Sequence, residues 1–221
     1  NPDDYMNNRL DSLSKFYENK YNTHEFNVSL RTIREKYQYN IGFSVQPQQS
    51  TTSYEQGTIK VDTTRNVVNF SPTFDYRYRF NKQSMLRINY RGRTSQPSMT
   101  DLLPITDTSD PLNISKGNPS LKPSYTNSFM LFYNTFLPEK QQSMMARLTF
   151  SNTINSVSNT VTYDEETGAR ITQPKNINGN WSASGGFVFN TPLKNKKFTV
   201  STFSDGSYNN MVGFTSLSGQ T

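Results

Sequence analysis

Arginine recurs at every second or fourth position through two neighbouring segments of the chain. These residues are Arg77, Arg79, Arg87, Arg91 and Arg93. A guanidinium group stays charged and donates a fork of hydrogen bonds, so a row of arginines suits an anionic surface or solute. Asp75 precedes the row and could pair with one member. The other interpretation is a solvated protein wall that binds nothing, and the residues alone leave both open.

Patterns for catalysis and for metal binding are scarce in the rest of the chain. His24 is the single histidine and cysteine is absent, while nucleophile elbows, phosphate loops and metal-ligand spacings are missing. Asp107 and Asp110, and the acidic stretch 164–166, could hold calcium weakly, but polar loop tips also explain them. The sequence therefore predicts a protein that is not an enzyme, with no cofactor and no metal, and with His24 in solvent.

The composition limits the class of protein. The 221 residues are only 32% hydrophobic, yet 13% are aromatic, an average typical of strands with one apolar and one wet face. The net charge of +6 comes from scattered lysines and arginines, so nucleic-acid binding is not expected. The apolar runs fall far short of the ~20 residues that a membrane helix needs.

Alternation with a period of two is the main structural signal. Between residues 68 and 80 every second side chain is apolar or aromatic, and the arginines lie on the opposite face. Similar strands are expected at residues 26–31, 37–47, 86–93, 125–137, 144–157, 178–190 and 197–208. About eight antiparallel strands should thus occupy residues 24–211, within a single domain. Residues 1–23 are expected to form a loop or a short helix, and residues 212–221 a loop.

The connections between these strands alternate in length. Short turns are expected near Glu35 and at residues 81–85, 138–143 and 191–196. Long connections are expected at residues 48–66, 96–124 and 159–175. Short turns at one rim and long loops at the other are typical of outer-membrane barrels, whereas a soluble sandwich has less reason to separate them. The fold predicted is all-β, an antiparallel up-and-down transmembrane β-barrel.

The turn after Phe80 allows a prediction of register. If Phe80 lies opposite Leu86, every outward pair is apolar, and Phe74 covers Gly92, which stabilises a bare strand position. The inner face would then pair Asp75 with Arg91, and Arg79 with Arg87. The two arginines would repel one another unless an anionic group neutralises them.

The longest connection carries two motifs that resemble a known family. YRGRTSQPSMTDLL, which begins at Tyr90, resembles the strand end that in TonB-dependent outer-membrane receptors carries an aromatic, an arginine and a proline-serine pair. GNPSLKP resembles their GNPxLKPE box, with Ser124 in place of the usual glutamate. The matching residues are Arg93, Pro97, Ser98, Gly117, Asn118, Pro119, Leu121, Lys122 and Pro123. The box is expected to form a structural corner, because its prolines fix φ and its Gly-Asn pair tolerates a turn.

The resemblance implies a location in the outer membrane of a Gram-negative bacterium, in contact with its lipid. Receptors of this family have a barrel of about 22 strands around a plug domain of the same polypeptide, which engages TonB. Eight strands without a plug suggest a fragment of such a barrel, although a self-contained eight-stranded barrel is a competing possibility. The inward Asp75 and the arginines would face the plug or the passing solute.

The function implied is energised uptake of a scarce solute, which could be a small molecule, a glycan or a peptide. One alternative is a non-transporting outer-membrane scaffold or surface-binding barrel. A further alternative is a soluble carbohydrate-binding β-sandwich.

Overall fold

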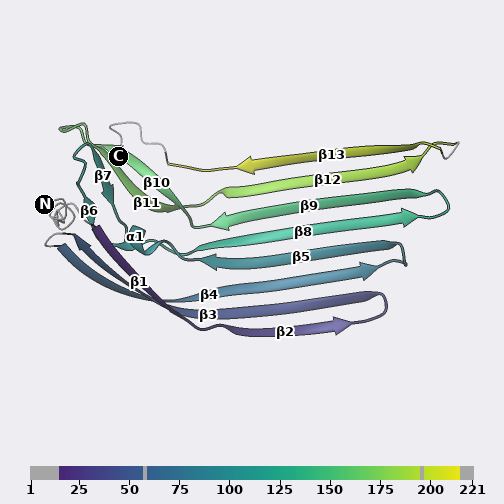
Figure 1. Ribbon diagram of the computed structural model, residues 1–221, viewed down its shortest axis with the longest axis horizontal. Helices are drawn as coiled ribbons and strands as arrows, with labels where there is room; N and C mark the ends of the chain where they lie inside the picture. Colours follow the sequence, from purple (N-terminus) through teal and green to yellow (C-terminus); the bar gives the residue numbers. More distant parts are fainter. Residues whose placement is uncertain (1–14, 57–58, 195–196, 215–221) are drawn as a thin grey trace, which may run out of the picture.

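A computed structural model describes residues 15–56, 59–194 and 197–214 of the chain. It consists almost entirely of long strands that run side by side (Figure 1). The strands are β1 (Lys15–Thr23), β2 (Phe26–Ile33), β3 (Tyr37–Gln56), β4 (Ile59–Arg79), β5 (Ser84–Ser95), β6 (Thr106–Asp107), β7 (Asn113–Lys116), β8 (Ser124–Leu137), β9 (Gln142–Ile154), β10 (Ser156–Tyr163), β11 (Arg170–Ile177), β12 (Asn180–Pro192) and β13 (Thr199–Asn210). A short helix, α1 (Met99–Leu102), lies between β5 and β6. Within the described residues, no helix is long and apolar enough to cross a bilayer.

Nine strands form one antiparallel sheet in the order β1-β3-β4-β5-β8-β9-β12-β13, with β2 also paired to β3. Because β1 and β2 pair with successive parts of β3, the sheet has eight positions along its width. The predicted antiparallel wall of about eight strands is therefore confirmed. The sheet is open: among the described residues, β1 and β2 form one edge and β13 the other.

The first sheet position contains a break between β1 and β2. Thr23 pairs with Gln48 and Phe26 pairs with Val45, so the register continues across the break. Opposite it lies Pro47, which has no N–H to donate, although its carbonyl accepts from the His24 N–H at 3.0 Å. The prediction of a loop or helix up to residue 23 is wrong for residues 15–23, which form β1. Residues 1–14 and 215–221 lie outside the described part.

The two ends of the sheet differ as the sequence predicts. The short turns that follow β2, β4, β8 and β12 gather at one end, and the long connections gather at the other (Figure 1). Two of the expected long connections, however, are largely strand. Residues 48–66 mainly extend β3 and β4, and residues 159–175 form most of the β10–β11 hairpin. Polar residues occupy both faces of these extensions, so the sequence lacks the alternation that marks a half-buried strand.

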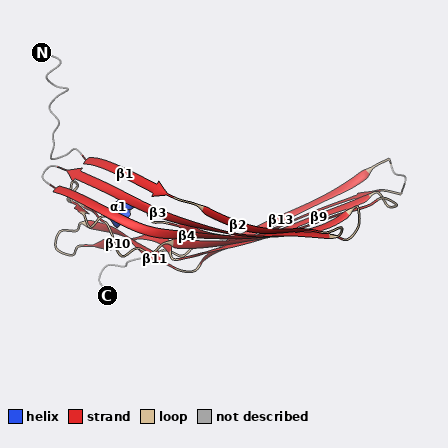
Figure 2. Cartoon of the chain, turned by 90° about the horizontal axis from the view of Figure 1, so that it is seen from below, coloured by secondary structure: helices blue, strands red, loops and turns tan. Residues whose placement is uncertain are grey.

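The long connections build a second, smaller sheet in the order β10-β11-β7-β6. Its central pair, β11 and β7, is parallel, with Ile171 opposite Ile114. The other two pairs are antiparallel. Figure 2 shows α1, β10 and β11 at the end of the long sheet where β1 and β3 lie, away from the β13 and β9 turns.

The connections cover part of one face of the long sheet, at the end where the long connections gather. Arg65 Nη2 donates to the Leu121 carbonyl at 3.1 Å, and Gln96 Nε2 donates to Asn69 Oδ1 at 2.6 Å. Tyr54 and Thr52 of the same face are almost fully buried. Strand side chains alternate between faces, and β4 pairs with β3 without a break in register. The covered face of β4 is therefore also the face of Asp75 and Arg77, and we call it the inner face.

A row of aromatic rings crosses the opposite, outer face. It runs over β5, β8, β9, β12 and β13 through Tyr90, Phe129, Phe150, Trp181 and Tyr208, with successive ring centroids 4.7, 6.4, 6.1 and 5.1 Å apart. Phe74 of β4 pairs with Tyr90 and extends the row by one strand. Apolar and aromatic side chains that point outward are typical of the lipid-facing band of transmembrane barrels. The row therefore supports the assignment of the outer face to lipid.

Tyr76 tests this assignment, because it lies on the outer face between Tyr39 and Ile88. We expect Tyr76→Arg in the full-length protein to lower the free energy of unfolding by about 2–4 kcal/mol, the cost of a cation near the bilayer midplane. The measurement is denaturant unfolding in lipid vesicles. Ser71→Arg, on the inner face of the same strand, is the matched control and should cost far less. Equal costs for the two variants would contradict the assignment of faces.

Candidate functional site

The β4–β5 hairpin places the arginines in a register that differs from the predicted one. Tyr78, not Phe80, lies opposite Leu86, and Phe74 lies opposite Tyr90. On the inner face Asp75 pairs with Asn89 and Arg77 pairs with Arg87. The predicted pairs Asp75–Arg91 and Arg79–Arg87 are therefore wrong. The shift is an even number of residues, so every side chain keeps its predicted face.

A tighter turn causes this shift. The Phe80 N–H donates to the Ser84 carbonyl at 3.0 Å, and the Gln83 N–H donates to Asn81 Oδ1 at 2.9 Å. An asparagine that binds the backbone two residues later favours a compact turn. Ser84 and Met85 consequently join β5 instead of remaining in the loop.

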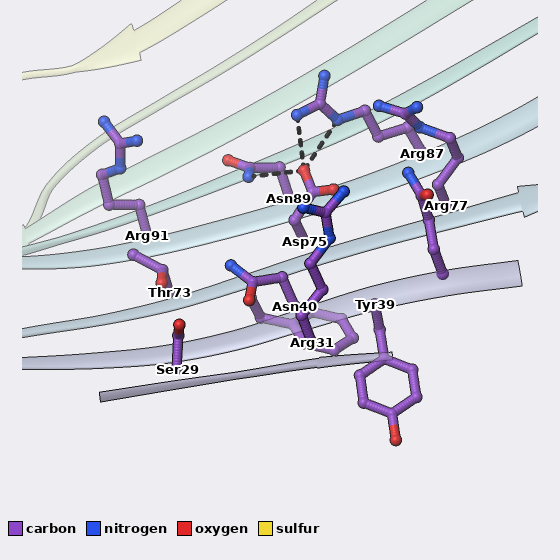
Figure 3. Close-up of a pocket in the computed structure, with 12 residues that line it drawn as sticks. Ser29, Arg31, Tyr39, Asn40, Thr73, Asp75, Arg77, Arg87, Asn89 and Arg91 are labelled. Atoms are coloured by element: carbon purple, nitrogen blue, oxygen red, sulfur yellow. Dashed lines mark hydrogen bonds and ion pairs between the residues drawn. The ribbon is translucent and has the colours of Figure 1, made fainter. Parts of the chain in front are cut away.

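Asp75 is the acidic centre of the inner face. Arg87 donates to Asp75 Oδ2 through Nε at 2.9 Å and through Nη2 at 2.6 Å. Asn89 Nδ2 donates to the same oxygen at 3.3 Å. Figure 3 shows Arg87 and Asn89 converging on this carboxylate from the neighbouring strand. The arginine that pairs with Asp75 is therefore Arg87, not the predicted Arg91.

Four arginines surround a recess of about 560 Å³ beside this ion pair, and they are Arg31, Arg77, Arg87 and Arg91. Among the described residues, Asp75 is the one carboxylate that pairs with any of them. Arg77 Nε is buried and has no hydrogen-bond partner there. An unpaired buried donor costs roughly 1–3 kcal/mol, so the recess favours an anionic group.

The remaining predicted arginines lie on the same face but apart from the ion pair. Arg79 pairs with Met85 near the short turns, and Arg93 pairs with Thr126 towards the long connections. Sequence reasoning missed Arg31 and Asn40, which also line the recess. The alternation of β2 could have identified Arg31, because Arg31 lies on the face opposite the outward residues Val28 and Leu30.

Gly92 is covered by an aromatic side chain, but not by Phe74. A Cβ atom at Gly92 would lie 2.0 Å from the Tyr125 hydroxyl and 2.9 Å from Pro72 Cγ. Tyr125 comes from β8, on the other side of β5, where it pairs with Thr94. The bare strand position is thus covered by a side chain of β8 and not by one of β4.

The inner face also carries an apolar patch that sequence reasoning missed. The patch consists of Met85, Met130, Phe132, Met145, Val188 and Phe203. Register joins its members across the strands: Met145 pairs with Val188, which pairs with Phe203. Met145 remains 42% exposed and Phe203 69% exposed. Both faces of β8 and β9 therefore carry apolar residues, which weakens the alternation from which faces are read.

The GNPSLKP segment forms a corner between the two sheets. A Cβ atom at Gly117 would lie 1.9 Å from the Leu103 carbonyl oxygen, so only glycine fits there. Asn118 Nδ2 donates to the Pro174 carbonyl at 2.9 Å, and its Oδ1 accepts from the Ser120 N–H at 3.0 Å. Leu121 is buried with Met99 and Leu102 in a small apolar cluster. These contacts fix the path of the chain where it passes between the two sheets.

The flanks of this corner are fixed by side chains. Asn176 Oδ1 accepts from the Lys122 N–H at 2.8 Å, and its Nδ2 donates to the Lys122 carbonyl at 2.9 Å. Ser98 caps α1, because its hydroxyl accepts from the Asp101 N–H at 3.1 Å. Pro97 is buried beside it, whereas Pro119 is exposed and Pro123 half-buried.

The loop carboxylates form hydrogen bonds within their own turns. Asp107 pairs with Lys15 of β1 and accepts from the Ser109 N–H at 3.0 Å. Lys15 and Ser109 lower the pKa of Asp107 from 3.8 to about 2. Asp110 accepts from Asn113 Nδ2 at 2.8 Å, and Asp164 accepts from the Thr167 N–H at 2.9 Å. Each of these contacts also lowers the pKa of the carboxyl group.

Within the described ranges, no group of three or more His, Cys, Asp or Glu side chains is placed so that it could hold a metal ion. His24, the single histidine, is exposed at the break between β1 and β2. The polar groups that do converge in this region are those of the inner face and of the corner.

Comparison with known proteins agrees with this wall of antiparallel strands. The model of the Outer membrane protein beta-barrel family matches residues 3–220. The chain belongs to this family. Its place is therefore the outer membrane of a Gram-negative bacterium, and its open sheet is part of a barrel wall. No curated protein sequence matches the chain.

Two solved outer-membrane barrels share the fold at low sequence identity. The siderophore receptor PirA from Pseudomonas aeruginosa is 11% identical, with a TM-score of 0.50, over 88% of this chain and 44% of that one. The outer membrane transporter YddB from Escherichia coli is 11% identical, with a TM-score of 0.50, over 87% of this chain and 34% of that one. The chain thus spans less than half the length of either barrel.

Gly117 provides a test of the corner. We expect Gly117→Ala to destabilise the segment between Met99 and Leu121 by about 1–3 kcal/mol, the usual cost of overpacking. Faster hydrogen exchange of the amides in this segment would report the loss. Gly206→Ala in β13 is the control, because its added methyl group would meet no atom within 4 Å. Unchanged exchange in the Gly117 variant would contradict the tight fit.

The Asp107–Lys15 pair predicts a dependence on pH. Folding lowers the pKa of Asp107, so the ionised carboxylate stabilises the folded state. This stabilisation is complete above about pH 4 and is lost as the pH falls towards 2. Pepsin should therefore cut residues 96–123 progressively faster over this range. Asp107→Asn should remove the added pH dependence, whereas Asp62→Asn, at an exposed position of β4, should leave it unchanged. Identical profiles for all three proteins would exclude this role.

Proposed function

We propose that the chain forms part of the barrel wall of a TonB-dependent receptor, which takes up a scarce solute across the outer membrane with energy relayed by TonB. In this proposal a plug domain of the same polypeptide fills the lumen. Asp75 and the inward arginines contact the plug or the passing solute. The long connections, such as residues 101–116, help to capture the solute outside.

The apolar patch of the inner face carries this proposal. A water-filled pore gains nothing from lining its wall with methionine and phenylalanine, because exposed apolar surface is unfavourable in water. A packed domain would cover Met145 and Phe203 and remove them from water. Arg77 and Arg87 lie next to the patch, since Phe132 pairs with Arg87. A plug whose apolar and acidic side chains face the wall would pack against the apolar patch and pair with the neighbouring arginines.

The two motifs of the longest connection support the same choice. Both resemble segments of TonB-dependent receptors, and GNPSLKP occupies a corner where its glycine and asparagine have defined contacts. The name of one solved neighbour, a siderophore receptor, agrees with uptake of a scarce solute by such a barrel.

Single cysteines can test for the plug, because the chain itself has none. We expect Met145→Cys in the full-length protein to be protected from a water-soluble maleimide in intact outer membranes, because the plug covers it. Leu148→Cys, on the outer face of the same strand, should be protected by lipid. Lys60→Cys, at an exposed position at the start of β4 near the long connections, should react fully. Rapid labelling at Met145→Cys would indicate an open, water-filled lumen and overturn the plug.

Coupling to TonB is tested separately. The detergent-solubilised full-length protein should bind the periplasmic domain of TonB, and binding should strengthen when the transported solute is present. A protein that has the covered lumen but does not bind TonB would favour the non-transporting scaffold.

A further inference from the structure

Positive charge gathers at the short-turn end of the sheet. The described lysines and arginines of the four turns are Arg34, Lys36, Lys82, Lys140, Lys194 and Lys197, and all are exposed. Two glutamates, Glu35 and Glu139, accompany them. Among the described residues, no ion pair joins Arg34, Lys36 or Lys82 to a carboxylate. The four turns together form a cationic rim.

The opposite end of the molecule has no such excess. Residues 96–123 contain three aspartates and two lysines, and residues 156–177 contain three acidic and two basic residues. The net charge of the chain is +6. A good part of this positive charge therefore lies at the short turns, which in outer-membrane barrels face the periplasm.

Outward aromatic rings lie directly beside the cationic rim. Tyr78 and Phe80 have ring centroids 4.9 Å apart, and Phe80 lies 6.1 Å from Tyr133. Tyr37 pairs with Tyr78 and is 39% exposed on the same face. Tyrosine and phenylalanine in this position mark the depth of the lipid headgroups. The rim cations thus lie at the level where phosphate groups of the inner leaflet are found.

The backbone holds the best-defined part of the rim in place. The Arg34 N–H donates to the Tyr37 carbonyl at 2.8 Å, and the Arg79 N–H donates to the Lys36 carbonyl at 2.7 Å. These bonds fix the β2–β3 turn against the end of β4. Arg34 and Lys36 therefore present their charges from a rigid base, which lowers the entropy lost when a ligand binds.

We propose that this cationic rim binds the headgroups of anionic phospholipids in the periplasmic leaflet of the outer membrane. The cations are spread over successive turns instead of forming one patch, which matches a row of lipids along the wall. A single acidic protein partner would need a compact surface. Binding would anchor the depth and tilt of the barrel, and it needs only the membrane wall, not a plug or TonB.

Native mass spectrometry of the full-length protein can measure this selectivity. The probes are phosphatidylglycerol, with one net negative charge, and phosphatidylethanolamine, with none. We expect the wild-type protein to prefer phosphatidylglycerol, and the preference to fall as salt increases. The triple variant Arg34→Gln, Lys36→Gln, Lys82→Gln should lose about fivefold in this preference for each cation removed.

A matched control removes the same charge from the other end. Lys60→Gln, Lys122→Gln and Lys175→Gln lie at exposed positions near the long connections and should leave the preference unchanged. Equal affinities of the wild-type protein for the two lipids would overturn the proposal without any variant. It would also be overturned if the rim variant kept its preference but lost a periplasmic protein partner, because the rim would then bind protein.

Discussion

A strand inside a bilayer can satisfy its backbone only through its neighbours, because hydrocarbon offers neither donors nor acceptors. This constraint accounts for the continuous antiparallel ladders from β3 to β13 and for their fixed register. Register in turn decides which side chains share a face, since neighbours along a strand point to opposite sides. The ion pair of Asp75 and Arg87, the recess around it and the aromatic row on the other side all follow from that pairing.

The membrane-crossing strands could be predicted from the sequence for the same reason. One face of β4 meets lipid and the other does not, so Val68 to Phe80 alternate without interruption. The sequence could not specify the pairing of β4 with β5 to the residue. A hydrogen bond from the Gln83 backbone to Asn81 tightened the turn, and both candidate registers place apolar residues opposite one another.

Prediction failed where the bilayer no longer imposes two different environments. β1 and the ends of β3 and β4 near the long connections have polar residues on both faces. Nothing in their pattern therefore distinguishes strand from loop. The inner patch of Met145, Val188 and Phe203 shows the opposite difficulty. Apolar residues on a second face erase the alternation, and only the pairing of β9, β12 and β13 shows that they lie together.

β3 is longer than a strand needs to be to cross the bilayer. β3 has 20 residues, whereas a tilted strand crosses a bilayer in about 9–11. Roughly 30 Å of paired ribbon, at ~3.3 Å per residue, thus projects into the surroundings. Proteases bind an extended backbone with free hydrogen-bonding groups, and here those groups are already occupied by β1 and β4. In the part of β3 that extends beyond the bilayer, little of the backbone is therefore free for a protease to bind.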